Sequence, residues 1–375
     1  MEFGIFHSGH VLNQENADAQ RKAEHGRLMD EVAASVAGDQ NGFKYSWWTE
    51  HHFLEQYSHV SASEVIMAYA AAKTDRIHHG SGIWNLTPPV NPPARVAERV
   101  AMMDHVTEGR FEWGTGRGSS STEYQGFGIP DGDMTRAMHD EALPEILRMF
   151  RETRYSYDGT HFSMPERNVL PKPYTEPHPP LWIACGSPST FKKAGELGMG
   201  ALCFALGPPD TLAPLIDEYK KAVAKCDNPI GGYVNDNVAC VSRLMCLEDG
   251  DRAIDIASSI GSGYYQSLVF RWLDSIPKPA GVPEWPELLP EPDEAASRAA
   301  VAKGMLIAGN PEECVDALRG YERVGADQVI FGILNNTVPL DVALESIELF
   351  GKDVLPEYDK DPVHSTTRQR EAQVG

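Results

Sequence analysis

The sequence WWTEHHF, Trp47–Phe53, places two histidines and a carboxylate directly after a short apolar run that begins at Phe43. A run of this length and composition predicts a buried strand. Titratable side chains at the end of a buried strand cost free energy unless they are paired or functional. In proteins whose strands and helices alternate, the carboxyl ends of the strands carry the chemistry. The stretch therefore predicts a strand–helix fold with a functional site at this strand end.

The rest of the chain alternates between strand-like and helix-like segments. Eight segments are predicted to be strands: 3–7, 43–48, 77–84, 110–113, 181–185, 201–204, 237–246 and 328–333. Each is followed by a segment that we predict to be helical, the first being 17–37, with apolar residues at helical spacing. Because such crossovers make the strands parallel, the pattern predicts a (β/α)8 TIM barrel with insertions. A doubly wound open sheet is the competing architecture, which the continued alternation disfavours.

The chain is expected to form one barrel domain over residues 1–358, followed by a polar tail, 359–375, that we predict to be disordered. Residues 251–303 are the least regular part of the chain. We interpret them as an insertion that could cover the barrel mouth as a lid. A small hairpin is predicted around Asp158-Gly159.

Composition excludes several classes of protein. The 375 residues carry a formal charge of −21, and no run of Lys and Arg offers a basic face for nucleic acid. The six cysteines are scattered without a C-x-x-C pair, which argues against a disulfide framework and a structural zinc site. No segment looks like a signal peptide or a membrane span, so a cytoplasmic location is the default expectation.

The histidines near the second predicted strand do not form a metal motif. His51, His52, Glu55 and His59 lie close together, but H-E-x-x-H is absent, and H-x-x-E-H fails because Gln56 replaces its last histidine. We therefore predict no metal site.

Two later strand ends could bind phosphate. Residues 114–119 begin like G-x-G-x-x-G, but Ser119 occupies the last glycine position and the segment follows a fourth strand, so a Rossmann fold is disfavoured. The glycines instead let the backbone approach a ligand, and Arg117 offers a fork for phosphate. Residues 186–190 end the fifth predicted strand and open a helix, where free N–H groups bind phosphate. Helix capping by Ser187 or Ser189 is the simpler explanation of that segment.

Several motifs, in order along the chain, resemble the bacterial luciferase-like flavin-dependent monooxygenases. They are MEFGIF (1–6), EHHF (50–53), GSGIW (80–84), ERVAMMDH (98–105), GRF (109–111), GTGRG (114–118), PEEC (311–314) and GAD (325–327). The resemblance covers roughly residues 1–205 and 304–355, and the block from 98 to 118 is its most specific part.

The resemblance implies a catalytic group at the second strand end. His51 matches the family's active-site histidine near the reactive edge of the flavin, where it would support proton transfer. Glu50 and His52 flank it and are expected to orient it. Together these three residues form the predicted catalytic set.

The resemblance also implies a set of cofactor-binding residues: Gly82, Ile83, Trp84, Gly116, Arg117, Gly186, Ser187 and Thr190. Gly82-Ile83 falls where the family often has a non-proline cis peptide beneath the isoalloxazine ring, and Arg117 matches the phosphate-binding arginine. Two positions depart from luciferase. Its active-site cysteine is Gly116 here, which is expected to open space, and the acidic residue before its serine is Gly186. Light emission is therefore not implied.

The resemblance implies a monooxygenase that uses reduced FMN, supplied by a separate flavin reductase, and oxygen to oxygenate a small, apolar organic substrate. A homodimer is expected. The pocket is expected to contain apolar and aromatic side chains: Phe6, Trp48, Trp84, Phe204 and either Tyr264 or Trp272. An F420-dependent oxidoreductase of the same barrel family and a non-catalytic flavin-binding protein are the alternatives. The signature around His51 favours the FMN branch, and retention of both His51 and Arg117 argues against mere storage.

Overall fold

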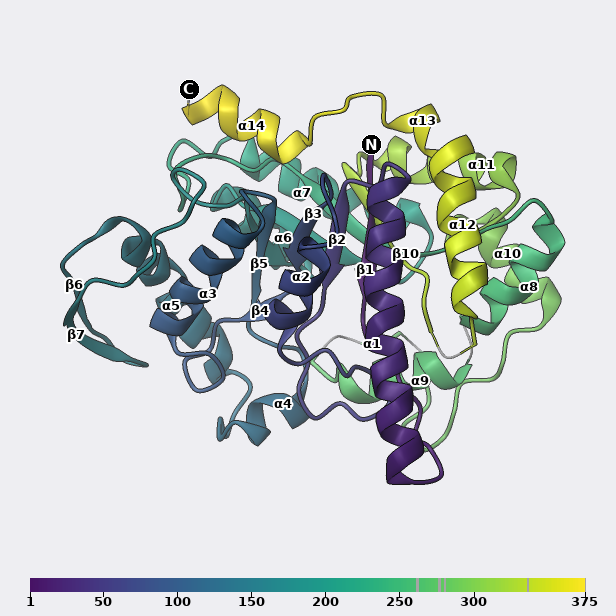
Figure 1. Cartoon of the computed structure of the whole chain (residues 1–375), viewed down its shortest axis with the longest axis horizontal. Coiled ribbons are helices and arrows are strands. Elements are labelled where there is room, and N and C mark those ends of the chain that lie inside the picture. The colour runs from purple at the N-terminus through teal and green to yellow at the C-terminus, as the bar shows by residue number, and fades with distance from the viewer. Residues whose placement is uncertain (261–262, 276–277, 280, 336, 375) are drawn as a thin grey trace.

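Eight parallel strands close into a barrel in the computed structural model, which describes residues 1–260, 263–275, 278–279, 281–335 and 337–374 (Figure 1). In order around the barrel they are β1 (Glu2–His7), β2 (Tyr45–Trp48), β3 (His78–Ser81), β5 (Phe111–Gly116), β8 (Leu181–Ala184), β9 (Gly200–Phe204), β10 (Val238–Cys246) and β12 (Gln328–Gly332). Strand β12 pairs with both β10 and β1, which closes the barrel. The predicted (β/α)8 fold is therefore confirmed.

Three shorter pairings complete the sheets. Strand β4 (Trp84–Asn85) continues the line of β3 and pairs with β5, and β11 (Ile307–Gly309) pairs with β10. Strands β6 (Tyr155–Asp158) and β7 (Ser163–Arg167) form the predicted antiparallel hairpin.

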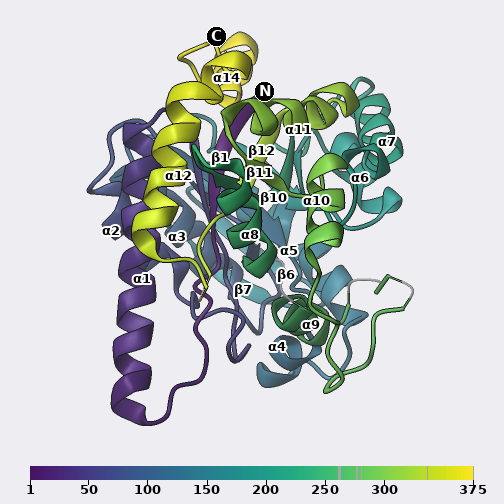
Figure 2. The ribbon, with the colours of Figure 1, turned by 90° about the vertical axis from the view of Figure 1, so that its right-hand side faces the viewer.

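Helices surround the barrel on its outside (Figures 1 and 2). The barrel strands are connected by α1 (Ala17–Gln40), α2 (Ser63–Ala71), α3 (Pro93–Val106), α5 (Met134–Arg151), α6 (Pro188–Glu196), α7 (Ala213–Val223) and α11 (Pro311–Val324), and α12 (Leu340–Asp353) follows the last one. Local sequence fixes several boundaries. Helix α11 begins at a capping box between Asn310 and Glu313 and ends at Gly325, whose φ of 85° suits a glycine.

Aromatic side chains fill the inside of the barrel. The rings of Trp47 and Trp182 meet edge to face with centroids 5.2 Å apart. A Cβ on Gly80 would lie 2.3 Å from the Trp47 ring, and a Cβ on Gly200 would lie 2.4 Å from the Trp182 ring. Only glycine fits at these two positions, so the pair of tryptophans and the pair of glycines depend on each other.

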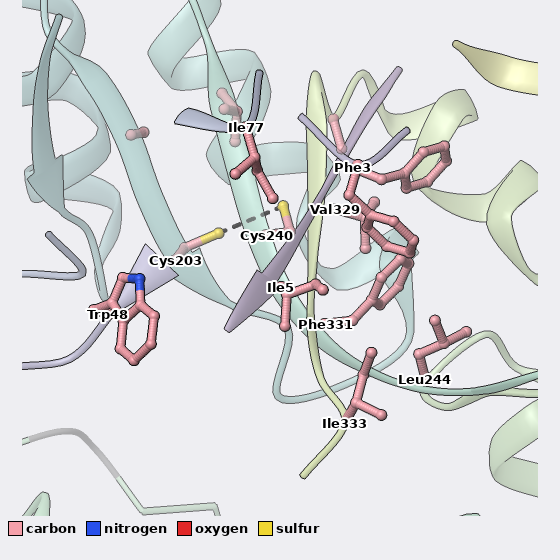
Figure 3. Close-up of a cluster of buried hydrophobic side chains, with 14 of the residues drawn as sticks. Phe3, Ile5, Trp48, Ile77, Cys203, Cys240, Leu244, Val329, Phe331 and Ile333 are labelled. Carbon is pink, nitrogen blue, oxygen red and sulfur yellow. Dashed lines mark hydrogen bonds between the residues drawn. The ribbon is translucent and has the colours of Figure 1, made fainter. Parts of the chain in front are cut away.

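The outward-facing residues of the strands form the larger core, between the barrel and its helices (Figure 3). Phe3 and Ile5 leave β1 on this side, and Phe3 stacks on Phe331 with ring centroids 5.9 Å apart. Cys203 and Cys240 lie on neighbouring strands with their sulfurs 3.6 Å apart, as free thiols. Because both faces of each strand are buried, one in this core and one inside the barrel, each strand is a nearly continuous apolar run in the sequence.

The insertion lies at the carboxyl end of the barrel. It contains α8 (Gly250–Ile260), α9 (Gly263–Trp272) and α10 (Glu294–Ala302). Trp272 Nε1 donates to the carbonyl of Glu55 at 3.0 Å, and the Tyr264 hydroxyl donates to Gln56 at 2.6 Å. These bonds hold α9 over the loop that follows β2. That the insertion moves as a lid stays a prediction.

The predicted disorder of the tail is wrong. After the short helix α13 (Leu355–Tyr358), residues Ser365–Val374 form α14, which lies across the amino end of the barrel (Figure 1). Ser365 donates to Glu2 at 2.5 Å, and Thr366 donates to Glu112 at 2.7 Å. Because the tail is held by polar bonds to residues far away in the sequence, its low hydrophobicity gave no sign of order.

No helix in the described part of the chain combines the length and apolar character needed to cross a bilayer.

Candidate active site at the carboxyl end of the barrel

His51 is held by a carboxylate that the sequence analysis did not single out. Its Nδ1 lies 3.1 Å from Oε1 of Glu123, and the backbone N–H of His52 donates to the same oxygen at 2.9 Å. Glu123 is buried on the short helix α4 (Ser121–Gly126), which follows β5. A carboxylate beside Nδ1 favours the tautomer with its proton there. Nε2 then presents a lone pair, and no described residue hydrogen-bonds to it.

Glu50 does not orient His51, contrary to expectation. It accepts from Arg99 Nη2 and from Asn91 Nδ2, both at 2.8 Å. Burial would raise the pKa of the Glu50 carboxyl, but the nearby His52 and the charge of Arg99 outweigh it and hold that pKa below its usual value. Glu50 therefore ties α3 to the end of β2 as a carboxylate.

His52 sits beside this ion pair and not beside the His51 ring. Its Nε2 lies 3.6 Å from Glu50, and its ring meets Phe127 edge to face at 4.9 Å. Its link to His51 is through the backbone N–H that shares Glu123. One signal for Glu123 was present in the sequence: an acidic residue in the first turn of a helix directly after the glycine cluster.

Ile83 and Gly116 form part of the floor of the mouth. The peptide bond between Gly82 and Ile83 is cis, as the resemblance implies. A Cβ on Gly116 would lie 2.6 Å from Cδ1 of Ile83. The expectation that Gly116 opens space is therefore wrong, because the isoleucine side chain already occupies the room that a cysteine would need.

The two tryptophans predicted to contact a ligand face the wrong way. Trp84 is fully buried on the outside of the barrel, where its indole N–H donates to Ser63 at 2.8 Å and Arg99 stacks on its ring. Trp48 is also fully buried there and stacks on His7. Both predictions of pocket-lining side chains are wrong, because the alternation of the strands turns these two residues away from the mouth.

Phe6 and Phe204 do line the mouth, as predicted. Their rings come from β1 and β9, three strands apart around the barrel, and meet edge to face with centroids 5.9 Å apart. They line a cavity of about 240 Å³ between the strand ends and the insertion. From α9 the cavity receives Tyr265, Val269 and Phe270, and neither Tyr264 nor Trp272 is among its lining residues.

Arg117 and the start of α6 lie at the ends of adjacent strands, β5 and β8. Arg117 Nη1 donates to Thr135 Oγ1 at 2.8 Å, and burial, together with the charge of Arg136, lowers the pKa of its guanidinium. Thr190 Oγ1 accepts from the N–H groups of Gly186 and Ser187 at 3.1 and 3.0 Å.

Ser187 and Thr190 form a capping box at this helix start, so the capping by Ser187 that the sequence analysis gave as the simpler explanation is present. A Cβ on Gly186 would meet nothing within 4 Å, so the space in front of the helix start is open. An arginine fork and an uncovered helix start suit a phosphate group. Within the described residues, no group of three or more His, Cys, Asp or Glu side chains is placed to hold a metal ion.

The family is decided by a comparison with family models. The model described as luciferase-like monooxygenase matches residues 1–328. The chain belongs to this family. The family predicted from the motifs around His51 and Arg117 is thereby confirmed.

Relatives of this luciferase-like monooxygenase cover nearly its whole length. Limonene 1,2-monooxygenase of Rhodococcus erythropolis is 26% identical over 327 residues, which are 86% of this chain and 79% of that protein. The oxygenating constituent of 3,6-diketocamphane monooxygenase of Pseudomonas putida, solved in complex with FMN, has a TM-score of 0.76 at 18% identity, covering 95% of this chain and 98% of the other. The F420-dependent tetrahydromethanopterin reductase of Methanopyrus kandleri has a TM-score of 0.65 at 20% identity, covering 96% and 99%. The solved structures show the shared barrel and leave the cofactor of this chain open.

Proposed function

We propose that this luciferase-like monooxygenase is the oxygenase of a two-component system. It uses reduced FMN, delivered by a separate flavin reductase, and molecular oxygen to oxygenate a small organic substrate. The observation that carries the proposal is the arrangement of four consecutive strands, β2, β3, β5 and β8. Their ends present in turn His51, Ile83, Arg117 and the start of α6.

The spacing of these strands supports the assignment. Neighbouring strands lie about 4.8 Å apart, so the phosphate-competent end of β8 and the imidazole after β2 are on the order of 10–15 Å apart. That span suits a ribityl phosphate chain followed by a flat ring system. The name of a structural relative also supports it, since that oxygenating constituent was solved with FMN.

Each group would have one task. Arg117, the Ser187 hydroxyl and the Ser189 N–H at the start of α6 would hold the phosphate, because the N–H groups of Gly186 and Ser187 already donate to Thr190. Ile83, Phe6 and Phe204 would offer an apolar bed to the ring. Reduced FMN supplies the two-electron reactivity toward oxygen when bound. His51 would take or return a proton at Nε2, because Glu123 holds Nδ1. The insertion would exclude water from the mouth.

The experiment is an anaerobic titration of the protein with reduced FMN and, separately, with reduced F420, followed by air and a substrate screen. The proposal expects tight binding of reduced FMN and oxygen consumption with substrate. F420-linked turnover without oxygen consumption would establish the F420-dependent alternative. Flavin binding without turnover of any substrate would establish the non-catalytic one.

A variant pair locates the phosphate. Arg117→Ala should weaken FMN binding by roughly 1.5–3 kcal/mol, the range for a hydrogen bond to a charged group. Arg136→Ala is the matched control, since this exposed arginine acts on Arg117 only through its charge. Equal affinity of both variants would move the phosphate elsewhere. The homodimer stays a prediction that sedimentation of the purified chain tests.

A further inference from the structure

Arg243 lies at the mouth of the barrel because of the alternation along β10. Ala239 and Val241 point into the barrel and pack with its inner cluster. Arg243 occupies the next inward position toward the carboxyl end, and it lines the cavity of about 240 Å³. No other lysine, arginine, histidine, aspartate or glutamate of the described chain lines that cavity.

The Arg243 guanidinium has no counter-ion among the residues that the structure describes. Within the described part of the chain it makes no hydrogen bond or ion pair. The titratable groups near it are the phenols of Tyr265 and Tyr321, whose pKa values burial raises, so they carry no charge at neutral pH. The residues outside that part contribute no acidic side chain. Burial lowers the pKa of the guanidinium, but an arginine stays protonated at neutral pH. By contrast, Arg99 at the same end is paired with Glu50 and Glu64.

A sheltered cation without a partner is costly in a native protein. Here it faces a cavity of ligand size, and the other walls of that cavity are largely apolar. The planar fork of a guanidinium matches a carboxylate in a bidentate geometry. The missing partner is therefore most simply a group on a ligand.

The cavity lies on the half of the mouth opposite the proposed FMN residues. Strand β10 is four strands from β3 in either direction around the barrel. The strand residues that line the cavity come from β1, β9, β10 and β12, and none comes from β3, β5 or β8. Arg243 is thus separate from the phosphate site at Arg117.

The cavity nevertheless adjoins the proposed catalytic histidine. Tyr57 lines it, and the Tyr57 ring meets His51 with centroids 5.4 Å apart. On its other side Tyr57 stacks on Tyr265, at 6.1 Å, and Tyr265 also lines the cavity. A molecule held by Arg243 would lie between that arginine and the His51 end of the mouth.

We propose that Arg243 binds the carboxylate of the substrate, and that the side chains of Phe204, Phe270 and Leu334 receive its apolar body. The substrate class is then a small organic carboxylic acid, which adds a charge to the apolar molecule expected from the sequence. This inference rests on the proposed function and names the substrate class of the same site.

The test uses matched pairs of acids and amides of equal shape: phenylacetate with phenylacetamide, and octanoate with octanamide. Calorimetric titration of the full chain, with and without FMN, gives the ratio of the two affinities within each pair. We expect at least one acid to bind about tenfold or more tightly than its amide. That ratio should fall to near one in Arg243→Met and be partly kept in Arg243→Lys.

Arg319→Met is the control, because it removes the same charge from an exposed position on α11. FMN affinity should be unchanged in Arg243→Met. The proposal is overturned if the unaltered protein binds no acid, if it binds acid and amide equally, or if Arg243→Met keeps the preference. The comparison within the unaltered protein stands even if a variant does not fold.

The two proposals fail separately. Acid preference that depends on Arg243, in a protein that neither binds FMN nor consumes oxygen, would contradict the proposed function alone. FMN binding and oxygen use without acid preference would contradict the carboxylate site alone. A loss of FMN affinity in Arg243→Met, with no acid preference in the unaltered protein, would assign the arginine to the cofactor and overturn the inference.

Discussion

The two ends of this barrel use buried polar side chains in opposite ways. At the amino end, α14 closes the barrel, and the carboxylates beneath it bond to other parts of the same chain (Figures 1 and 2). At the carboxyl end, Arg243 and Nε2 of His51 have no hydrogen-bond partner among the described residues. The difference separates groups that stabilise the fold from groups that are kept for a ligand.

Glu112 shows how the closed end is satisfied. It accepts from Trp182 and Thr366, each at 2.7 Å, and lies 2.8 Å from His78. Burial raises the pKa of Glu112 to about 8 and lowers that of His78 to about 3. The contact between them is therefore a hydrogen bond between neutral groups at neutral pH, not an ion pair.

The same end also holds ion pairs and a buried polar group without a partner. Lys44 bridges Glu2 and Asp359 at 2.7 and 3.0 Å, and Glu2 receives the hydroxyl of Ser365. The side-chain amide of Gln328 is buried there without a hydrogen-bond partner in the described structure. Most of the buried polar side chains described at this end therefore have a hydrogen-bond or ion-pair partner. Helix α14 supplies several of these partners.

Removing α14 should have the largest effect on stability. A chain that ends at Pro362 would expose the amino end and strip Glu2 and Glu112 of their α14 partners. We expect a loss of on the order of 4 kcal/mol or more in the free energy of unfolding, from several hydrogen bonds to buried carboxyl groups. Urea unfolding followed by circular dichroism measures it. Stability equal to that of the full chain would mean that α14 is dispensable and that the two ends are alike.

Substitutions at the carboxyl end should lower the rate of product formation and change the free energy of unfolding very little. His51→Gln should keep FMN binding and lower product formation by about 10²–10⁴-fold, if the imidazole transfers a proton. Glu123→Gln should lower it less, because the ring stays and only its orientation weakens. Single-turnover product yield with reduced FMN and oxygen is the readout. Full activity of His51→Gln would remove this residue from the mechanism.

Glu112→Gln should change how stability depends on pH. The folded-state pKa of Glu112, about 8, lies above its ordinary value of 4.5, so its contribution favours the folded state at low pH and is lost as the pH rises through that interval. The variant should therefore gain stability relative to the unaltered chain between pH 5 and 9, by on the order of 1–3 kcal/mol.

Glu98→Gln, in an ion pair with Arg95 on the surface of α3, is the control and should show no such trend. A stability difference for Glu112→Gln that stays flat with pH would mean that Glu112 is ionised in the folded protein. The closed end would then contain a further buried charge besides the ion pairs of Lys44.

The smallest effect is expected where the insertion meets the loop after β2. Trp272→Phe removes the bond to the Glu55 carbonyl and keeps the ring packing, which should cost about 0.5–1.5 kcal/mol of local stability. If that contact keeps water out of the mouth, the fraction of reduced FMN that yields hydrogen peroxide instead of product should rise. Unchanged coupling would argue against a sealing role for α9.

The sequence by itself determined the strand and helix rhythm, the barrel and the family. These depend on local periodicity and on short motifs, such as the stretch at Trp47–Phe53 and the glycine cluster before Arg117, which can be read within a few residues. The prediction that Trp84 lines the pocket was wrong. The strand is interrupted between Ser81 and Trp84, and this interruption, together with the alternation of side chains along the strand, determines which way the Trp84 ring points.

Only the tertiary structure decided the partners. Glu123 reaches His51 across 72 residues, and α14 reaches Glu112 across 254. Ile83 fills the room beside Gly116, and Arg243 faces a cavity that the insertion helps to enclose. Each is a contact between segments that are distant along the chain, where no periodicity or spacing carries a signal. Packing alone establishes which polar groups are satisfied and which are left for a ligand.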